Sequence, residues 1–376
     1  MHILIAPNAF KNSLSADAAA AAICRGLMES SLDCTCDCFP VGDGGDGTAA
    51  LIIEKCAGEW VETTVHNPFG NLVETGFGII EAGKTAVIEM ANASGLRLLP
   101  AAELQPLRSN AFGTGQQLLA ALDRGVKKII IGMGGSATVD GGTGILKALG
   151  IHFLDAAGNA LQQLPGDLTR LAAIDMSTLD KRLEETALVV LCDVDNRLLG
   201  PAGAATVFGP QKGADATEVL QLEAGLQQLA ILASQQTGKD MAAVLHGGTA
   251  GGAAAGLFAF LDAQLVNGID YFLSLTGFDA FLEKADLVIT AEGSIDEQTL
   301  QGKGPFGVAS RAKRKGLPVI GLAGKIPLQK NELLQQYFDV LLPIGHQPAD
   351  LQAAMADTGE NLARTAMTIG NLLALR

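Results

Sequence analysis

The sequence predicts an α/β protein in which a Rossmann-like parallel-sheet domain is interrupted by a second, inserted α/β domain. Two observations predict this fold class. Short apolar runs alternate with helix-length stretches near both ends of the chain, which is typical of a parallel sheet covered on both faces. The middle of the chain instead shows the alternation of antiparallel strands. The 376 residues are enough for two domains with buried cores.

The two ends of the chain are expected to form one sheet. HILIAP (2–7) is an apolar run, the segment SLSADAAAAAICRGLME that follows has helical character, and CTCDCFPV (34–41) predicts a second strand. Near the C-terminus, DLVITA (286–291), PVIGLAG (318–324) and DVLLPI (339–344) predict three more strands. We assign residues 1–66 and 286–376 to this discontinuous domain.

The inserted domain is expected to span residues 67–285. VETTVHNPFGNLVETGFGII (61–80) and KTAVIEMA (84–91) alternate in polarity and are rich in Thr and Val, as antiparallel strands are. KKIIIGMG (127–134) and TALVVLCDV (186–194) add buried strands. The expected place for an active site is the cleft between the two domains.

Composition excludes several classes of protein. Hydrophobic residues make up 48% and charged residues 18%, the balance of a compact globular chain. A net charge of −14 argues against nucleic acid or an anionic membrane as partner, because both require a basic surface. The most apolar run, 251–261, ends at Asp262, short of the ~20 residues that a bilayer requires. With no signal-peptide pattern at the N-terminus, we expect a cytoplasmic protein.

Five loops share one design: an apolar strand leads into a polar turn that is rich in glycine or in capping residues. Ligands of open α/β sheets bind at such carboxyl ends of strands. The same polar residues also suit a purely structural role, as helix caps or turn residues, and each loop leaves that alternative open.

The first two loops offer a cation and two carboxylates. PNAFKNSLSA (7–16) carries Lys11, with Ser13 and Ser15 as helix N-cap candidates. PVGDGGDGT (40–48) places Asp43 and Asp46 among four glycines. Glycines let the backbone approach a ligand, and carboxylate oxygens are the ligands that Mg²⁺ prefers.

The other loops extend this chemistry. Their candidate ligand groups are hydroxyls, carboxylates, an amide and two lysines, and several smaller candidates lie near them. The third loop (129–144) carries Ser136, Thr138 and Asp140; the fourth (189–214) carries Asp193, Asp195, Asn196 and Lys212; the fifth (286–309) carries Glu292, Asp296, Thr299 and Lys303; the smaller candidates are Arg108, Ser109 and Thr114 in LRSNAFGTGQ and Glu89 and Ser94 in EMANASGL.

Other chemistries have little support in the sequence. The five histidines are scattered without an H-x-x-x-H pair, which disfavours a zinc site or a Ser-His-Asp hydrolase. The first strand is not followed by G-x-G-x-x-G, which disfavours a Rossmann dehydrogenase. No lysine–hydroxyl pair follows the glycines of the third loop at the spacing of a Walker A motif.

Taken in order, the loops resemble those of bacterial glycerate kinases of the type I class. The resemblance rests on PNAFKNSLSA, PVGDGGDGT, GMGGSATVDGG, CDVDN and DLVITAEGSIDEQTLQGK, and extends over the whole chain. It implies a two-domain α/β enzyme that uses ATP and Mg²⁺ to phosphorylate D-glycerate, with 2-phosphoglycerate as the usual product.

The chain departs from the family pattern in three of its motifs. The first motif more often reads Asp-Ser-Phe-Lys-Gly, and here it begins with Asn8. The third motif commonly has Asn where this chain has Val139, and the last has Arg where this chain has Ser294.

The resemblance and the chemistry of phosphoryl transfer together suggest roles for these residues. Asp193 is the preferred general base, with Asp43 as second choice and Lys11 as the third catalytic residue. We expect Lys11 and Lys303 to bind the phosphates and offset their negative charge. The expected metal environment is Asp43, Asp46, Glu292 and Asp296, and the expected substrate- or phosphate-binding residues are Ser13, Arg108, Thr114, Ser136, Asp140, Asp195, Asn196, Lys212 and Lys303.

Three alternatives stay open at this point. The enzyme could act on another small hydroxy acid, or it could form 3-phosphoglycerate. A non-enzymatic nucleotide- or metabolite-binding module is the third alternative, although carboxylates gathered in glycine turns argue against simple anion binding. The expected partners are D-glycerate and ATP, and the oligomeric state is open, with a homodimer as one option.

Overall fold

The computed structural model describes residues 1–375, which form two compact units. Unit 1 consists of residues 1–43 together with residues 269 onward, and unit 2 consists of residues 44–268. Each unit has a hydrophobic core of its own.

Unit 1 contains a five-stranded parallel sheet. Its order is β13-β12-β11-β1-β2, so the N-terminal strand lies between two strands from distant parts of the chain. This arrangement confirms that the two ends of the chain form one sheet. The strands are β1 (His2–Ile5), β2 (Thr35–Cys38), β11 (Leu287–Ser294), β12 (Val319–Lys325) and β13 (Val340–Pro343).

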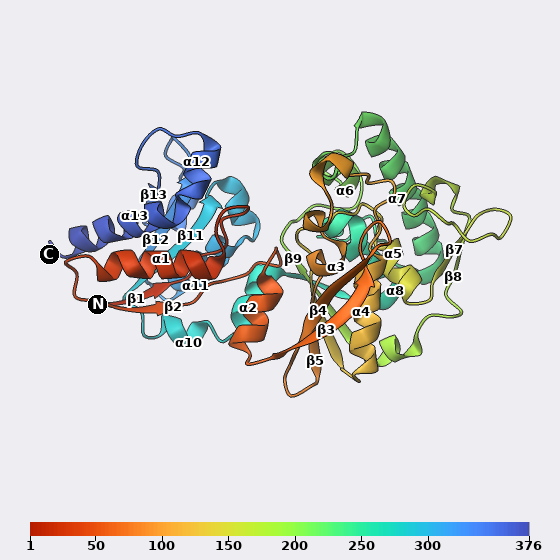
Figure 1. Ribbon diagram of the computed structural model, residues 1–376, viewed down its shortest axis with the longest axis horizontal. Coiled ribbons are helices and arrows are strands. Elements are labelled where there is room, and N and C mark those ends of the chain that lie inside the picture. Colours follow the sequence, from red (N-terminus) through yellow and green to blue (C-terminus); the bar gives the residue numbers. More distant parts are fainter. Residues whose placement is uncertain (376) are drawn as a thin grey trace. The chain divides into compact units, whose positions relative to one another are not determined.

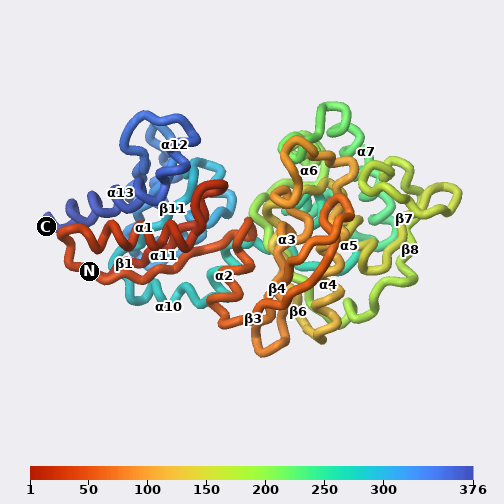
Figure 2. The backbone as a smooth tube through the Cα atoms, viewed as in Figure 1, coloured from red at the N-terminus to blue at the C-terminus, as the bar shows by residue number. Residues whose placement is uncertain are grey.

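Helices α1 (Ala16–Met28) and α13 (Thr358–Leu373) lie side by side against the sheet of unit 1 (Figure 1). Their contact depends on a glycine: a Cβ atom on Gly26 would lie 1.9 Å from the carbonyl oxygen of Ala363. Figure 2 shows the same pairing as the red N-terminal and blue C-terminal segments of the tube running together. The remaining helices of unit 1 are α9 (Gly268–Leu275), α10 (Asp279–Leu282), α11 (Gly304–Arg314) and α12 (Leu351–Ala356), with 3₁₀ turns η7 (Glu297–Gln301) and η8 (Leu334–Gln336).

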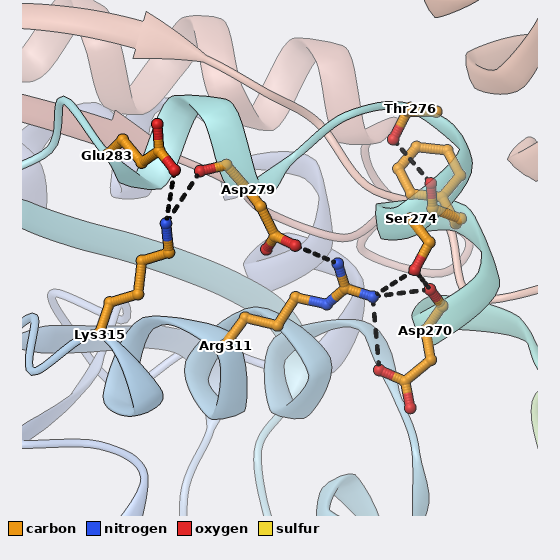
Figure 3. Close-up of polar contacts among 8 residues, drawn as sticks. Asp270, Ser274, Thr276, Asp279, Glu283, Arg311 and Lys315 are labelled. Carbon is orange, nitrogen blue, oxygen red and sulfur yellow. Dashed lines mark hydrogen bonds and ion pairs between the residues drawn. The ribbon is translucent and has the colours of Figure 1, made fainter.

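A buried arginine fastens α9 and α10 to α11 (Figure 3). Arg311 donates to the carboxylate of Asp279 at 3.2 Å, to the carbonyl oxygen of Asp270 at 2.8 Å and to Ser274 Oγ at 2.7 Å. Lys315, one turn further along, pairs with Glu283 at 3.2 Å. These contacts hold α9 and α10, the first helices of unit 1 after residue 268, against α11.

Unit 2 contains a six-stranded mixed sheet of order β10-β9-β6-β5-β4-β3. Strands β3, β4 and β5 pair antiparallel, whereas β5, β6, β9 and β10 pair parallel. A separate antiparallel hairpin joins β7 and β8. The strands are β3 (Glu59–His66), β4 (Leu72–Ile80), β5 (Thr85–Glu89), β6 (Lys128–Gly132), β7 (His152–Leu154), β8 (Ala173–Asp175), β9 (Ala187–Cys192) and β10 (Gln264–Asn267).

The helices of unit 2 pack around this sheet. The most apolar of them, α8, is buried on nearly all sides and ends at Leu261, and the next residue, Asp262, has a left-handed backbone. The α-helices are α2 (Thr48–Lys55), α3 (Ala91–Ser94), α4 (Phe112–Asp123), α5 (Thr143–Ala148), α6 (Ala204–Phe208), α7 (Ala216–Thr237) and α8 (Ala253–Leu261); the 3₁₀ turns are η1 (Leu96–Leu98), η2 (Ala101–Glu103), η3 (Leu168–Arg170), η4 (Lys181–Glu185), η5 (Pro210–Lys212) and η6 (Thr249–Gly252).

The unit boundaries, 43/44 and 268/269, differ from the predicted 66/67 and 285/286. Strand β3 belongs to unit 2 because it pairs with β4 along its whole length. Helices α9 and α10 belong to unit 1 because Phe278 and Phe281 pack edge-on against Phe39, which follows β2. Within residues 1–375, no helix has both the length and the apolar character needed to cross a membrane.

Candidate active site

Residues from three neighbouring strand ends meet at the carboxyl edge of the sheet in unit 1. Asp43 follows β2 and is buried. Its Oδ2 atom accepts a hydrogen bond from Asn8 Nδ2, just beyond β1, at 2.8 Å, and another from the backbone amide of Gly304 at 3.3 Å. Asn8, which replaces the usual family aspartate, thus acts as a neutral donor that holds one oxygen of Asp43.

Glu292, on β11, places a second carboxylate beside Asp43. The residue is half-buried, but its Oε2 atom is shielded from solvent and has no hydrogen-bond partner among residues 1–375. Burial first, and then the negative charge of Asp43, raise the pKa of Glu292 to about 8. An unpartnered carboxylate oxygen next to a second carboxylate is a costly arrangement that a bound cation would relieve.

Lys303 and Asp296 flank this pair. Lys303 is the N-cap residue of α11, and its positive charge acts to lower the pKa of Glu292. Asp296 caps η7, accepting hydrogen bonds from the backbone amide of Gln298 at 2.9 Å and from Ser294 Oγ at 3.2 Å. The predicted metal residue Asp296 therefore already has a structural function as a cap.

The first loop is tied down by its serines. Ser15 is the N-cap of α1, as predicted, and accepts from the amide of Ala18. Ser13 Oγ lies 2.7 Å from both the carbonyl oxygen of Met355 and Thr358 Oγ1, so it fastens the loop to the start of α13. Lys11 is exposed in the turn that precedes Ser13.

In unit 2, two glycine loops pack backbone against backbone. The amide of Gly134 donates to the carbonyl oxygen of Gly44 at 2.9 Å. A Cβ atom on Gly134 would lie 2.4 Å from the Cα of Gly45, and one on Gly44 would lie 2.8 Å from the carbonyl oxygen of Leu191. Gly44 and Gly134 are therefore required for close packing at the ends of β6 and β9.

Glu89, at the end of β5, holds the second half of that loop. Its carboxylate accepts hydrogen bonds from the amides of Gly47 at 3.0 Å and Ala49 at 3.1 Å, at the start of α2. Burial, with a contribution from the charge of Asp46, raises the pKa of Glu89 to about 7. Asp46 itself is half exposed and lies 3.5 Å from Arg97. Asp43 belongs to unit 1 and Asp46 to unit 2, so neither unit contains both of these predicted metal residues.

The loop after β6 surrounds a buried lysine. Lys212 Nζ donates to Ser136 Oγ at 3.0 Å and to the carbonyl oxygen of Thr138 at 2.7 Å, and only 3% of Lys212 is exposed. The structure thus joins two predicted binding residues that are 76 positions apart in the chain.

Asp140 is fully buried beneath the same loop. Its carboxylate accepts from the amides of Ala111 at 2.9 Å, Gly142 at 3.1 Å and Gly144 at 3.0 Å. Burial raises the pKa of Asp140, and these three hydrogen bonds act against that rise. Both carboxylate oxygens serve the backbone at the starts of α4 and α5, so the structure gives Asp140 a supporting position.

Two further predicted residues lie in the segment before and within α4. Thr114 is buried, and its Oγ1 lies 2.7 Å from Ser94 Oγ. Arg108 is exposed, donates to Gln105 Oε1 at 3.0 Å and lies over the ring of Phe69.

The loop after β9 carries the predicted base. Asp193 is half-buried directly beyond the strand. Asp195 lies 3.2 Å from His246 Nδ1, which donates to the carbonyl oxygen of Val194 at 2.8 Å. Asn196 Nδ2 donates to the carbonyl oxygen of Ala202 at 2.8 Å, which shapes the loop.

His246 was not predicted from the sequence as a site residue. The residue lies in HGGTAGG (246–252), far from Asp195 in the chain and without a preceding strand. The only local signal in the sequence is the density of glycine. In the structure, the backbone of this segment is left-handed at His246, Ala250 and Gly251. A Cβ atom on Gly251 would lie 2.0 Å from the carbonyl oxygen of Thr138, so this segment packs directly on the loop after β6.

The side chains of unit 1 fit a magnesium ion that arrives with a phosphate ligand. Among residues 1–375, no group of three or more His, Cys, Asp or Glu side chains is arranged to hold a metal. Asp43 and Glu292 offer two carboxylates, and Glu292 has an oxygen with no other partner. Mg²⁺ is usually bound by one or two carboxylates together with substrate phosphates and water, so this pair fits the ion.

Comparison with known proteins places the chain in a family. The model of the glycerate kinase family matches residues 3–374. The chain belongs to the glycerate kinase family. It is 44% identical over 369 residues to the glycerate kinase of Bacillus subtilis (strain 168), covering 98% of this chain and 97% of the relative. It is 40% identical over 375 residues to the glycerate 2-kinase of Escherichia coli (strain K12), covering 100% and 98%.

A solved structure agrees with this glycerate kinase assignment. A crystal structure assigned as glycerate kinase 2 from Salmonella typhimurium LT2 aligns with a TM-score of 0.82 at 42% identity, covering 99% of this chain and 98% of that one. The predicted resemblance and the predicted α/β fold class are both confirmed.

Proposed function

We propose that this protein transfers the γ-phosphoryl group of ATP to the 2-hydroxyl group of D-glycerate, giving 2-phosphoglycerate and ADP. The observation that carries the proposal is the shielded Glu292 Oε2 atom, which has no partner among residues 1–375 and lies beside Asp43. That pair is the cation-binding chemistry that a kinase requires at the carboxyl edge of a parallel sheet. The glycerate 2-kinase from Escherichia coli supports the choice of hydroxyl group.

Asp43 and Glu292 would hold Mg²⁺ in this reaction. Bound there, the ion would supply positive charge that neutralises part of the charge of the phosphates. Asn8 and the amide of Gly304 fix one oxygen of Asp43 and so orient the carboxylate. Lys303 and Lys11 supply positive charge for the phosphates. Asp296 contributes mainly by shaping the loop that carries Glu292.

Asp193 is the proposed general base. The oxygen of the glycerate 2-hydroxyl bonds to the γ-phosphorus as the bond from that phosphorus to the leaving ADP oxygen breaks, and Asp193 accepts the hydroxyl proton. Ser136 and Lys212 would bind substrate or phosphate oxygens, because their hydroxyl and ammonium groups already meet at one place in the structure. Asp195 and Asn196 position the loop after β9, and Asp140 supports the loop after β6.

A coupled assay tests the product and the base together. The protein is incubated with D-glycerate, ATP and MgCl₂, and the product is detected with enolase, which consumes 2-phosphoglycerate, with and without phosphoglycerate mutase. We expect a signal without the mutase. Asp193→Asn should lower kcat at least ~100-fold with unchanged folding, because it removes the proton acceptor. Asp17→Asn, in the exposed first turn of α1, is the control.

Two outcomes would contradict the proposal. A signal that requires the mutase would identify 3-phosphoglycerate as the product. Near-normal kcat in Asp193→Asn would exclude Asp193 as the base. Comparing D-glycerate with L-glycerate and tartronate tests the alternative of another small hydroxy acid, and we expect D-glycerate to give the highest kcat/KM.

A further inference from the structure

A pocket of about 360 Å³ lies in unit 2, and its lining within the described chain includes none of the residues to which the phosphoryl transfer is assigned. One wall begins at His66, the last residue of β3. Strand β3 runs parallel to β5, because both pair antiparallel with β4. His66 is therefore at the same edge of the sheet as the carboxyl ends of β5, β6 and β9, where ligands of α/β sheets bind.

Two carboxamides in the pocket lining have their oxygens occupied. Asn67 Oδ1 accepts hydrogen bonds from the amides of Phe69 and Asn71, both at 3.0 Å. Asn110 Oδ1 accepts from the amide of Phe112 at 3.1 Å. The group that each asparagine can offer to a ligand is therefore its amide nitrogen, a hydrogen-bond donor.

The charge of the lining has one sign. Lys147, on α5, supplies an ammonium group, and none of the lining residues within the described chain is Asp or Glu. In a protein with a net charge of −14, a pocket lined by a lysine and two amide donors favours a small anion, and a carboxylate accepts hydrogen bonds from all three groups.

Two other lining residues, His66 and Gln162, offer hydrogen-bond acceptors to a ligand. Gln116 Oε1 accepts from the backbone amide of His66 at 2.9 Å and lies 3.0 Å from His66 Nδ1. Because that oxygen is already an acceptor, Nδ1 carries the proton in the neutral ring, and Nε2 is left as an acceptor. Gln162 Nε2 donates to the carbonyl oxygen of Ala160 at 2.8 Å, which leaves its oxygen as the second acceptor.

We infer that this pocket binds a small polyhydroxy carboxylic acid. The donors Asn67, Asn110 and Lys147 suit a carboxylate, and the acceptors His66 Nε2 and Gln162 Oε1 suit hydroxyl groups. The ring of Phe112, edge-on to His66 with centroids 5.9 Å apart, adds an apolar wall for the carbon chain. Binding of the acid in this pocket is independent of whether the phosphoryl transfer takes place there.

The test uses a signal from the pocket itself. D-glycerate, propionate and inorganic phosphate are titrated separately into the full-length ¹⁵N-labelled protein, and the imidazole nitrogen resonances of His66, assigned by their loss in His66→Gln, are followed by NMR. We expect D-glycerate to shift the His66 signals in a saturable way. Propionate, which lacks both hydroxyls, should bind at least tenfold more weakly, and phosphate should give no comparable shift.

Matched variants complete the experiment. Lys147→Ala should raise the Kd for D-glycerate at least tenfold, whereas Lys181→Ala, an exposed lysine of the same unit, should leave it unchanged. The same titration in Asp193→Asn should match the wild type, so a failure of the proposed catalysis and a failure of the pocket are read separately. Absence of a His66 shift, equal Kd values in wild type and Lys147→Ala, or tighter binding of propionate or phosphate than of D-glycerate would each overturn the inference.

Discussion

At the scale of single residues, Glu292 is a carboxylate whose charge and burial are poorly balanced. Its shielded oxygen has no partner in the described chain, and it lies beside Asp43. In its surroundings, Asn8, Gly304, Ser294 and Gln298 donate hydrogen bonds to the aspartates on either side, Asp43 and Asp296. The polar groups nearby are therefore already committed, and Glu292 is left as the carboxylate with spare capacity for a cation.

This imbalance predicts a pH-dependent effect of Glu292→Gln. The pKa of Glu292 rises from its ordinary 4.5 to about 8 in the folded protein, so the folded state binds this proton more tightly than the unfolded chain. Ionisation of Glu292 therefore opposes folding increasingly from about pH 4.5 to about pH 8. Without nucleotide or metal, the variant should be more stable than wild type at pH 8, by ~1–2 kcal/mol, and nearly equal at pH 5.

Urea unfolding at the two pH values measures this difference, with the exposed Glu297→Gln as control. The variant should also lose most of its kcat, because a neutral amide replaces a proposed ligand of the metal. If Glu292→Gln had the stability of the wild type at both pH values and kept its kcat, the result would contradict both the charge state and the role assigned to Glu292.

At the scale of elements, the strands were largely predictable and the loops were not. Each predicted apolar run of unit 1 contains a strand. The central strands β1, β11 and β12 are buried over most of their length, which leaves a continuous apolar pattern, whereas the edge strands β2 and β13 are partly exposed. A polar residue in a glycine turn is ambiguous, because the same pattern serves ligand binding and helix capping. Asp140, Asp296 and Ser13 are engaged in supporting contacts that no local pattern could distinguish from a binding site.

The pairing of α1 with α13 gives an element-scale prediction. Gly26→Ala places a methyl group 1.9 Å from the carbonyl oxygen of Ala363, which must force the two helices apart. We expect a loss of ~2–3 kcal/mol in the free energy of unfolding, measured with urea.

The control for Gly26→Ala is Gly359→Ala, also in this helix pair. Gly359 lies in the first turn of α13, and the nearest atom to an added Cβ there is 4.0 Å away. This variant should be neutral or more stable by up to ~1 kcal/mol, because alanine favours the helix. Equal effects of the two substitutions would show that the close approach of α1 and α13 does not limit stability.

At the scale of the whole molecule, the two cores are separate. The core of unit 2 draws only on residues between Val61 and Ala263 and includes no residue of unit 1. The predicted boundaries missed this division because β3 and α9 carry no break in composition; their partners in the fold decide where they belong.

Residues 44–268 should therefore fold when expressed alone. We expect a dispersed amide NMR spectrum and a single cooperative thermal transition, because the sheet of unit 2 and the helices around it are all included. A fragment without a cooperative transition would show that its core depends on unit 1.

The position of β1 also dictates an order of events during synthesis. This strand is made long before its neighbour β11, which begins at Leu287. While translation proceeds, the leading segment has one edge of its backbone without a hydrogen-bonding neighbour, and the intervening unit can complete its own structure on the ribosome in the meantime. Until β11 is made, the free edge of β1 is thus open to wrong pairing, and chaperones would be expected to act on it there.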